Sequence, residues 1–167
     1  TKSFRSKNQE VSWGCYALIN SIIQGISITL DAEFNVEGGK VYETHMEEIK
    51  QGLEEPCFFV QCLNPTTELF LGKKNFRQNQ FCIQYFPESD DKQSECNAVA
   101  ERLTWCLEYI TVNGDKYRGT KMKSKVVDGV LNFFVNYDCF VYRVEDNTPM
   151  EEMTISTQTK EGDEYGS

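Results

Sequence analysis

Hydrophobic residues recur with two different periods along this chain, and the change of period separates helices from strands. From about Leu18 to Phe34 they repeat every three to four positions, which predicts an amphipathic helix. A second helical stripe follows the N-cap candidates Ser89, Asp90 and Asp91. Its apolar positions are Cys96, Val99, Ala100, Leu103, Cys106, Leu107 and Ile110. The pattern therefore predicts two helices.

Strands are predicted between and after these helices. In chain order they cover residues 41–49, 57–63, 68–72 and 75–86, and Asn64-Pro65 is expected to end the second of them. After the second helix, Asn113-Gly114 predicts a hairpin between residues 109–112 and 115–118. The order α-β-β-β-α-β-β indicates an α+β fold, a mainly antiparallel sheet with two helices packed on one face.

The clearest local signal is a long C-terminal hairpin over residues 121–144. Asp128-Gly129 favours a type I′ turn, which suits paired antiparallel strands. A continuous strand over Val130–Val144 would span about 50 Å. A usual strand spans roughly 17–20 Å. We therefore expect this one to bend at a bulge or to project from the domain, so that its tip or its second face meets a neighbour.

The two faces of this strand differ in composition. One carries Leu131, Phe133, Val135, Tyr137, Cys139 and Val141. The other carries Phe134, Asn136, Asp138, Phe140 and Tyr142. A two-sided core would explain the aromatic residues of the second face, but Asn136 and Asp138 argue against it. Because aromatic residues are enriched at protein interfaces, the second face is predicted to be a subunit or partner interface.

Three lysines alternate along the first strand of the hairpin. Lys121, Lys123 and Lys125 are expected to project from one face as a basic stripe, in a chain whose net charge is −9. Lysines on an edge strand discourage unwanted strand pairing, and this alone would account for them. The functional alternative is a surface that meets an acidic partner protein or a phosphate backbone.

Composition and charge limit the classes of function. The length and the 40% hydrophobic content predict one globular domain. The negative charge argues against general nucleic-acid binding. Residues 1–17 carry a net charge of +2 and residues 146–167 a net charge of −5, and the acidic end is expected to be disordered without a partner. No apolar run reaches the roughly 18 residues of a membrane helix, and residues 1–17 are too polar for a signal peptide.

No constellation of residues predicts catalysis, a metal site or a cofactor. The single histidine, His45, lies between Glu43 and Glu47 and is best explained by a solvated strand face. The acidic pairs Glu47-Glu48 and Glu54-Glu55 leave a small acidic-residue hydrolase as a distant alternative. The seven cysteines lack metal-ligand spacing and are expected to be free thiols in a reducing cytoplasm.

Several ordered segments resemble a known family. They are IKQGLEEPCFFVQCLNP (49–65), FRQNQFCIQYFP (76–87), NAVAERL (97–103) and RGTKMKSKVVDGVLNFFVNYDCFVYRVED (118–146). Together they resemble the tail terminator family of phages and prophages of Gram-positive bacteria. The resemblance assigns residues 18–146 to one tail-terminator-like domain. Residues 1–17 would be a non-native or disordered extension, and 147–167 an acidic, disordered tail.

The resemblance implies a structural protein without catalytic residues or cofactors. Such proteins form a hexameric ring that caps the tail tube, stops its polymerisation and provides the joining surface for the head-side connector. In contractile tails they also engage the sheath. DNA would be only passing cargo, no membrane would be involved, and the protein would lie in the virion tail or neck after assembly in the host cytoplasm. The lysine stripe would then face the ring lumen or a neighbouring subunit. Another neck protein, a head–tail joining or tail-completion factor, is the alternative.

Overall fold

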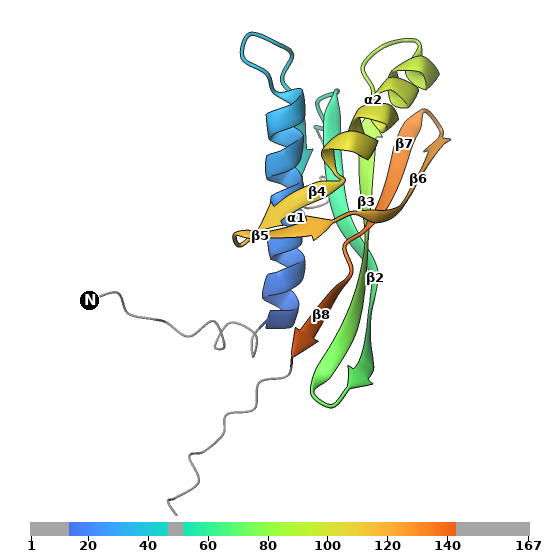
Figure 1. Cartoon of the computed structure of the whole chain (residues 1–167). Helices are drawn as coiled ribbons and strands as arrows, with labels where there is room; N and C mark the ends of the chain where they lie inside the picture. The colour runs from blue at the N-terminus through green and yellow to red at the C-terminus, as the bar shows by residue number, and fades with distance from the viewer. Residues whose placement is uncertain (1–13, 47–51, 143–167) are drawn as a thin grey trace, which may run out of the picture.

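The structure, a computed structural model, describes residues 14–46 and 52–142 (Figure 1). Its elements are α1 (Gly14–Phe34), β1 (Glu43–His45), β2 (Cys57–Leu71), β3 (Lys74–Phe86), α2 (Lys92–Cys106), β4 (Tyr109–Val112), β5 (Asp115–Arg118), β6 (Thr120–Val127), β7 (Val130–Asn136) and β8 (Cys139–Tyr142). The predicted α+β class and order of elements are confirmed. Helix α1 begins four residues before Leu18. Most of the predicted N-terminal extension, Glu47–Ile49, the end of the predicted long strand and the acidic tail lie outside the described residues.

The main sheet has the strand order β1-β2-β3-β7-β6, and β8 pairs with β3 beyond the end of β7. Strand β1 runs parallel to β2, and the other pairs of this sheet are antiparallel. Strands β4 and β5 form a separate hairpin, whose turn residues Asn113 and Gly114 both have positive φ, as predicted for this turn. Strand β6 is thus an edge strand of the main sheet.

Both helices cover the same face of the sheet. The register pairs Phe58 with Tyr85 and Ile83 with Phe133, so the inward side chains of three adjacent strands form one apolar layer. The helices contribute Ile22, Ile26, Leu30, Phe34, Cys96, Val99 and Leu103 to this core. At Gly25 the helix α1 lies so close to β4 that an added Cβ would be 2.8 Å from the Thr111 carbonyl oxygen. The opposite face of the sheet has no described element over it (Figure 1).

Strands β2 and β3 extend well beyond the part of the sheet that the two helices cover, which we call the body. They have 15 and 13 residues, and their paired ends extend past the rest of the sheet together with β8 (Figure 1). We call this extension, from Thr66 to Gln78 together with β8, the arm. The prediction that Asn64-Pro65 ends a strand was wrong, because the ladder between β2 and β3 shifts its register between Leu63 and Thr66 and then continues. A bulge absorbs the residues that cannot pair.

The predicted continuous strand from Val130 is interrupted at Tyr137-Asp138. There the Tyr137 amide donates to the Asn79 carbonyl (2.9 Å), and the Asn79 side-chain amide donates to the Tyr137 carbonyl (3.0 Å). The Asn79 backbone amide turns instead to the Asp138 carboxylate (3.1 Å). Pairing resumes in the same register, since Gln80 pairs with Asn136 before the break and Arg77 with Cys139 after it. The alternation of faces predicted from the sequence therefore continues into the arm.

The turn at Asp128-Gly129 has positive φ at both residues (52° and 76°), as a type I′ turn requires. Its tip does not project, however. A Cβ on Gly129 would lie 2.9 Å from the Lys92 side chain at the start of α2, and the Cys96 thiol lies 3.9 Å from the Gly129 carbonyl. Of the two expected alternatives, projection of the hairpin from the domain is not observed at this tip, because α2 packs beside the turn. The projecting hairpin is β2–β3.

A carboxylate fixes the start of α2 to the end of β3. Glu95 accepts hydrogen bonds from the Tyr85 hydroxyl (2.5 Å) and the Ser89 amide (2.9 Å), while Asp91 caps the helix by accepting from the Ser94 amide (3.2 Å). Burial opposes ionisation of Glu95, but the hydrogen bonds from Ser89 and Tyr85 outweigh it and lower the pKa of the carboxyl. The ionised group therefore contributes to the packing of α2.

Candidate interaction surfaces

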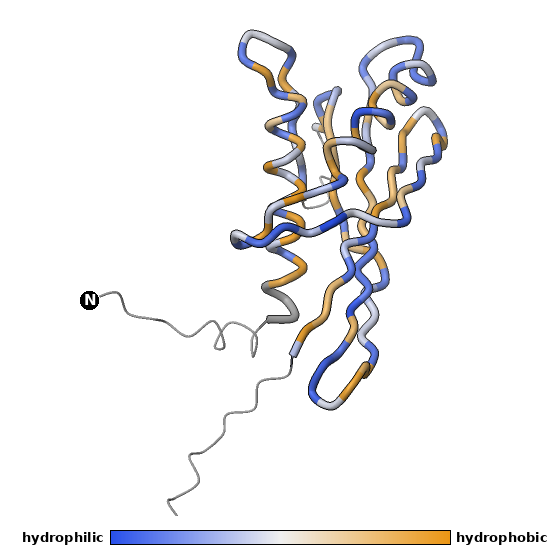
Figure 2. Tube along the Cα trace, viewed as in Figure 1, coloured by the Kyte–Doolittle hydropathy of each residue, from blue (hydrophilic) through white to orange (hydrophobic). Residues whose placement is uncertain are grey.

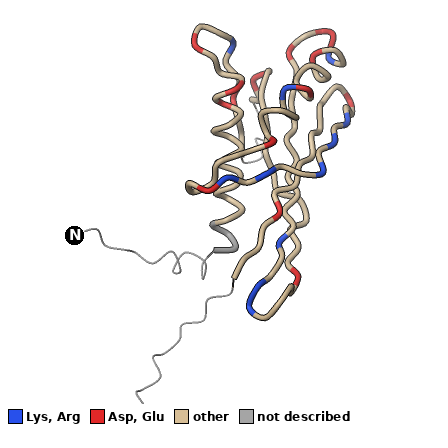
Figure 3. Tube along the Cα trace, viewed as in Figure 1, with Lys and Arg blue, Asp and Glu red and all other residues tan. Residues whose placement is uncertain are grey.

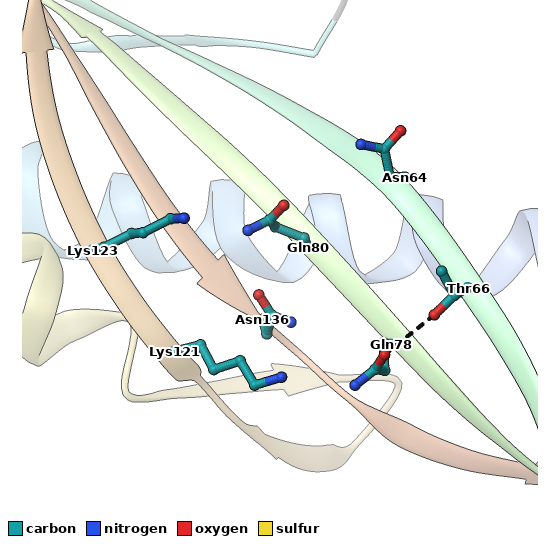
Figure 4. A pocket seen from close by; sticks show the side chains of 7 residues that line it. All are labelled: Asn64, Thr66, Gln78, Gln80, Lys121, Lys123 and Asn136. Atoms are coloured by element: carbon teal, nitrogen blue, oxygen red, sulfur yellow. Dashed lines mark hydrogen bonds between the residues drawn. The ribbon is translucent and has the colours of Figure 1, made fainter.

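The uncovered face of the sheet is hollowed where the arm leaves the body. A hollow of about 300 Å³ is lined by Asn64, Thr66, Gln78, Gln80, Lys121, Lys123 and Asn136 (Figure 4). We call it the amide–lysine hollow. Its lining comes from β2, β3, β7 and β6, and it contains four side-chain amides and two ammonium groups but no carboxylate. Its electrostatic character is therefore positive, within a chain that is negative overall.

Backbone irregularities on both sides shape this hollow. The register shifts of β2 and β6 place Asn64 and Lys121 in the left-handed region, with φ of 37° and 51°. Asparagine tolerates this region, but a long side chain such as lysine is uncommon there. Bulges often re-aim a side chain, and Lys121 and Lys123 both extend toward β7 here (Figure 4).

Asn136 forms part of the floor of the amide–lysine hollow. It is only 7% exposed, and its side-chain amide donates to the Asp138 carboxylate at 3.5 Å. Its side-chain carbonyl oxygen has no hydrogen-bond partner among the described residues. An acceptor that is buried without a donor is unfavourable by about 1–3 kcal/mol. The hollow therefore offers an acceptor as well as positive charge.

The third lysine of the stripe lines a neighbouring hollow of about 430 Å³. Its lining is Gln84, Phe86, Lys125, Val127, Asp128, Val130, Asn132 and Phe134. Lys123 lies between the two hollows, with its ammonium 5.3 Å from the centre of the Phe134 ring. The linings of the two hollows thus place Lys121, Lys123 and Lys125 on one face, as expected. Basic positions recur along the strand β6 in the backbone trace (Figure 3). Because β6 is an edge strand, the three lysines can also be explained by protection of this edge from unwanted strand pairing.

The arm carries an exposed cluster of aromatic rings on the same face. Phe140 packs against Phe70 and Phe76 with ring centres 5.0 and 5.1 Å apart. The Lys74 ammonium lies 4.1 Å from the centre of Phe140 and 5.8 Å from that of Tyr142. We call these five residues the arm cluster. It is open to solvent, with Phe70 60% exposed, and the adjacent Leu69 and Leu71 are more than 70% exposed (Figure 2).

The predicted interface residues occupy one face but fall into two groups. Phe134 and Asn136 line the hollows, whereas Phe140 and Tyr142 belong to the arm cluster. Asp138, between them, holds the strand interruption through Asn79. Sequence reasoning missed Phe70, Phe76 and Lys74. The apolar run Leu69-Phe70-Leu71 directly before Gly72 was a usable signal, because apolar residues beside an exposed turn have little core to enter.

The residues considered for catalysis do not form a site in the described part of the chain. His45 lies 3.5 Å from the Glu43 carboxylate, Glu54 and Glu55 are exposed, and Glu47 and Glu48 lie outside the described residues. Residues 14–46 and 52–142 contain no group of three or more side chains that could hold a metal ion, and no helix there could span a membrane. Burial raises the pKa of the Cys57 and Cys82 thiols to about 11, which keeps them protonated at neutral pH.

Comparison with protein-family models identifies the relationship. The model of a family described as phage tail terminator protein matches residues 21–149, which is most of the chain. The chain belongs to the phage tail terminator family. A search of curated proteins found no match. The family match confirms the resemblance to phage tail terminators noted from the sequence, whereas the Gram-positive host stays a prediction.

Membership places the protein among bacteriophage structural proteins. A tail terminator is a component of the virion tail and interacts with other tail and neck proteins. This agrees with the projecting arm, whose exposed apolar residues are suited to protein contacts.

Proposed function

We propose that this tail terminator acts as a hexameric ring that caps the tail tube, stops its polymerisation and provides the joining surface for the head-side connector. In a contractile tail the ring would also contact the sheath. DNA would pass through the ring without being a specific ligand, and assembly would take place in the cytoplasm of the bacterial host.

The arm is the observation that carries this proposal. It extends the sheet beyond the helices and presents Leu69, Phe70 and Leu71 to solvent at its tip. Removing apolar surface from water is favourable by roughly 25 cal/mol per Å². An exposed apolar tip on a projecting element is therefore suited to contact another subunit or the end of the tube.

A projecting arm also suits a ring geometrically. A contact between an arm and a different surface of the next copy is heterologous, and repeated rotation through such contacts closes a ring. The two faces of the ring would then differ, as a cap between tube and connector requires. The sheet face that carries the lysine stripe would be turned toward the lumen or the adjacent subunit.

Complementation of a gene deletion tests the proposal. Phage lacking the gene should form tails of uncontrolled length, and the wild-type gene should restore a uniform length in electron micrographs. A Phe70→Asp/Leu71→Asp variant should fail to restore it. Ile28→Asp is the matched control, since Ile28 is 62% exposed but lies on α1, away from the arm.

The same micrographs separate the alternative role. Tails of normal length that remain unattached to heads would contradict a terminator role and favour a head–tail joining factor. Normal phage yield from the arm variant would remove the arm from the proposal.

A further inference from the structure

The amide–lysine hollow has a polar lining that the proposed contacts of the arm tip do not use. Two register shifts, on β2 and on β6, converge on it from opposite sides of the β3–β7 pair. Lys121 is held at a φ of 51°, a backbone conformation that is strained for lysine, and strain of this kind points to a role for the residue that adopts it. A regular β6 would have avoided this strain.

The functional groups of the hollow define its ligand. The ammonium groups of Lys121 and Lys123 require acceptors, and no carboxylate lines the hollow to supply them. The unpartnered Asn136 carbonyl oxygen requires a donor. A ligand that fits therefore combines negative charge with N–H groups.

A peptide with acidic side chains meets both requirements. Its carboxylates would pair with the lysines, its backbone N–H could donate to Asn136, and its backbone carbonyl could accept from the amides of Gln78 or Gln80. A phosphodiester backbone offers acceptors alone and would leave Asn136 unpartnered. The volume of the hollow, about 300 Å³, is at the small end of ligand sites and limits the contact to a few residues of such a peptide.

The chain itself contains a peptide of this kind shortly after the end of β8 in the sequence. Residues 145–152 include Glu145, Asp146, Glu151 and Glu152, with no lysine or arginine. Tyr142, at the end of β8, lies six residues past Asn136 in the same register, about 20 Å along the strand. Glu151 follows Tyr142 by nine residues, so an extended chain could return about 30 Å.

We propose that the amide–lysine hollow binds the acidic segment Glu145–Glu152 of the same molecule, with Glu151 and Glu152 at Lys121 and Lys123. The segment would fold back along the face that carries Phe140 and Tyr142 and cover the junction of arm and body. The short connection favours this contact over one with a separate molecule, because it raises the effective concentration of the segment. The contact does not depend on ring formation.

Zero-length carbodiimide crosslinking of the full chain, followed by mass spectrometry, tests this contact. The reagent joins only carboxylates and amines that are in contact. We expect crosslinks from Lys121 and Lys123 to Glu151 and Glu152 within one molecule, at a yield at least about fivefold above that of Lys116, and a fall to the Lys116 level in about 0.5 M salt. Lys116, exposed on β5, is the internal control.

Charge reversal provides a second test of the contact. Either Lys121→Glu/Lys123→Glu or Glu151→Lys/Glu152→Lys alone should abolish the crosslink, and the two together should restore it. Thermal unfolding of each variant shows whether it folds, and the salt dependence of the unmodified chain needs no variant at all.

Three results would overturn the inference. The first is a yield at the Lys116 level in low salt. The second is crosslinks found only between isotopically distinct copies in a mixed sample, which would assign the hollow to a neighbouring subunit. The third is background crosslinking together with retention of a duplex DNA fragment, which would assign it to a phosphate backbone. None of these bears on tail length, so failure here and failure of the proposed ring are distinguishable.

Discussion

The body and the arm use the same strands in opposite ways. In the body, β2 and β3 have one face covered by α1 and α2, and Phe58 packs between Phe34 and Tyr85 with ring centres 4.8 and 4.9 Å away. In the arm the described chain places no helix over either strand, and the rings of Phe70 and Phe140 pack on each other but stay in contact with solvent. The residue types are similar, and their burial is not.

This difference means that aromatic residues of the body serve stability, whereas those of the arm are available for assembly. An aromatic side chain in the body contributes to folding because folding removes it from water. An aromatic side chain in the arm remains exposed after folding. Most of the free energy that its burial can contribute is therefore available for binding a partner. Substitutions in the two regions should therefore affect different measurements.

The largest effect on folding is expected at Phe58. Phe58→Ala should lower the free energy of unfolding by about 3–5 kcal/mol, because it leaves a cavity under both helices. Phe70→Ala, the matched change in the arm, should alter it by less than about 0.5 kcal/mol. Denaturant unfolding measures both. Comparable losses at the two positions would mean that the arm is part of the folded core.

A second change tests how the body is covered. Gly25→Ala should destabilise the protein by about 1–3 kcal/mol even though alanine favours helices, since the new Cβ would meet the Thr111 carbonyl at 2.8 Å. Gln24→Ala, at the exposed neighbouring position, is the control and should be neutral or slightly stabilising. Thermal and denaturant unfolding distinguish the two, and an unaffected Gly25→Ala would show that α1 can move away from β4.

The attachment of α2 should depend on pH. Glu95→Gln should reduce stability by about 1–2 kcal/mol at neutral pH through the loss of charge-assisted hydrogen bonds. Because folding lowers the pKa of Glu95, its contribution is present above the usual value of 4.5 and is lost as the pH falls through the lower folded value. Unfolding curves of the wild type and the variant should therefore converge in acid. A constant difference across the pH range would contradict this assignment.

The smallest expected effect concerns the border between arm and body. Lys121→Gly should raise stability by about 0.5–1 kcal/mol, since glycine adopts the left-handed backbone without strain. Lys123→Gly, in a regularly paired position, should lower it by a similar amount. If both variants lose stability, the backbone at Lys121 is not strained, and backbone strain does not indicate a role for the amide–lysine hollow.

Some features could be predicted from the sequence because they depend on neighbours along the chain. The stripe from Cys96 to Leu103 places α2, and the Asp128-Gly129 and Asn113-Gly114 turns appear where their dipeptides predict them. The alternation after Val130 correctly assigned Leu131, Phe133 and Val135 to the core and Phe134 to the other face. The ordered segments also sufficed to indicate the family.

The tertiary structure decided which hairpin projects and which lysines converge. Nothing local shows that α2 packs beside Gly129 or that β2 continues past Pro65, because both depend on strands paired across long stretches of chain. The interruption at Tyr137 requires Asn79, 58 residues earlier in the chain. Periodicity thus determined the face on which each side chain lies, whereas only long-range pairing and packing determined how far each strand runs and what covers it.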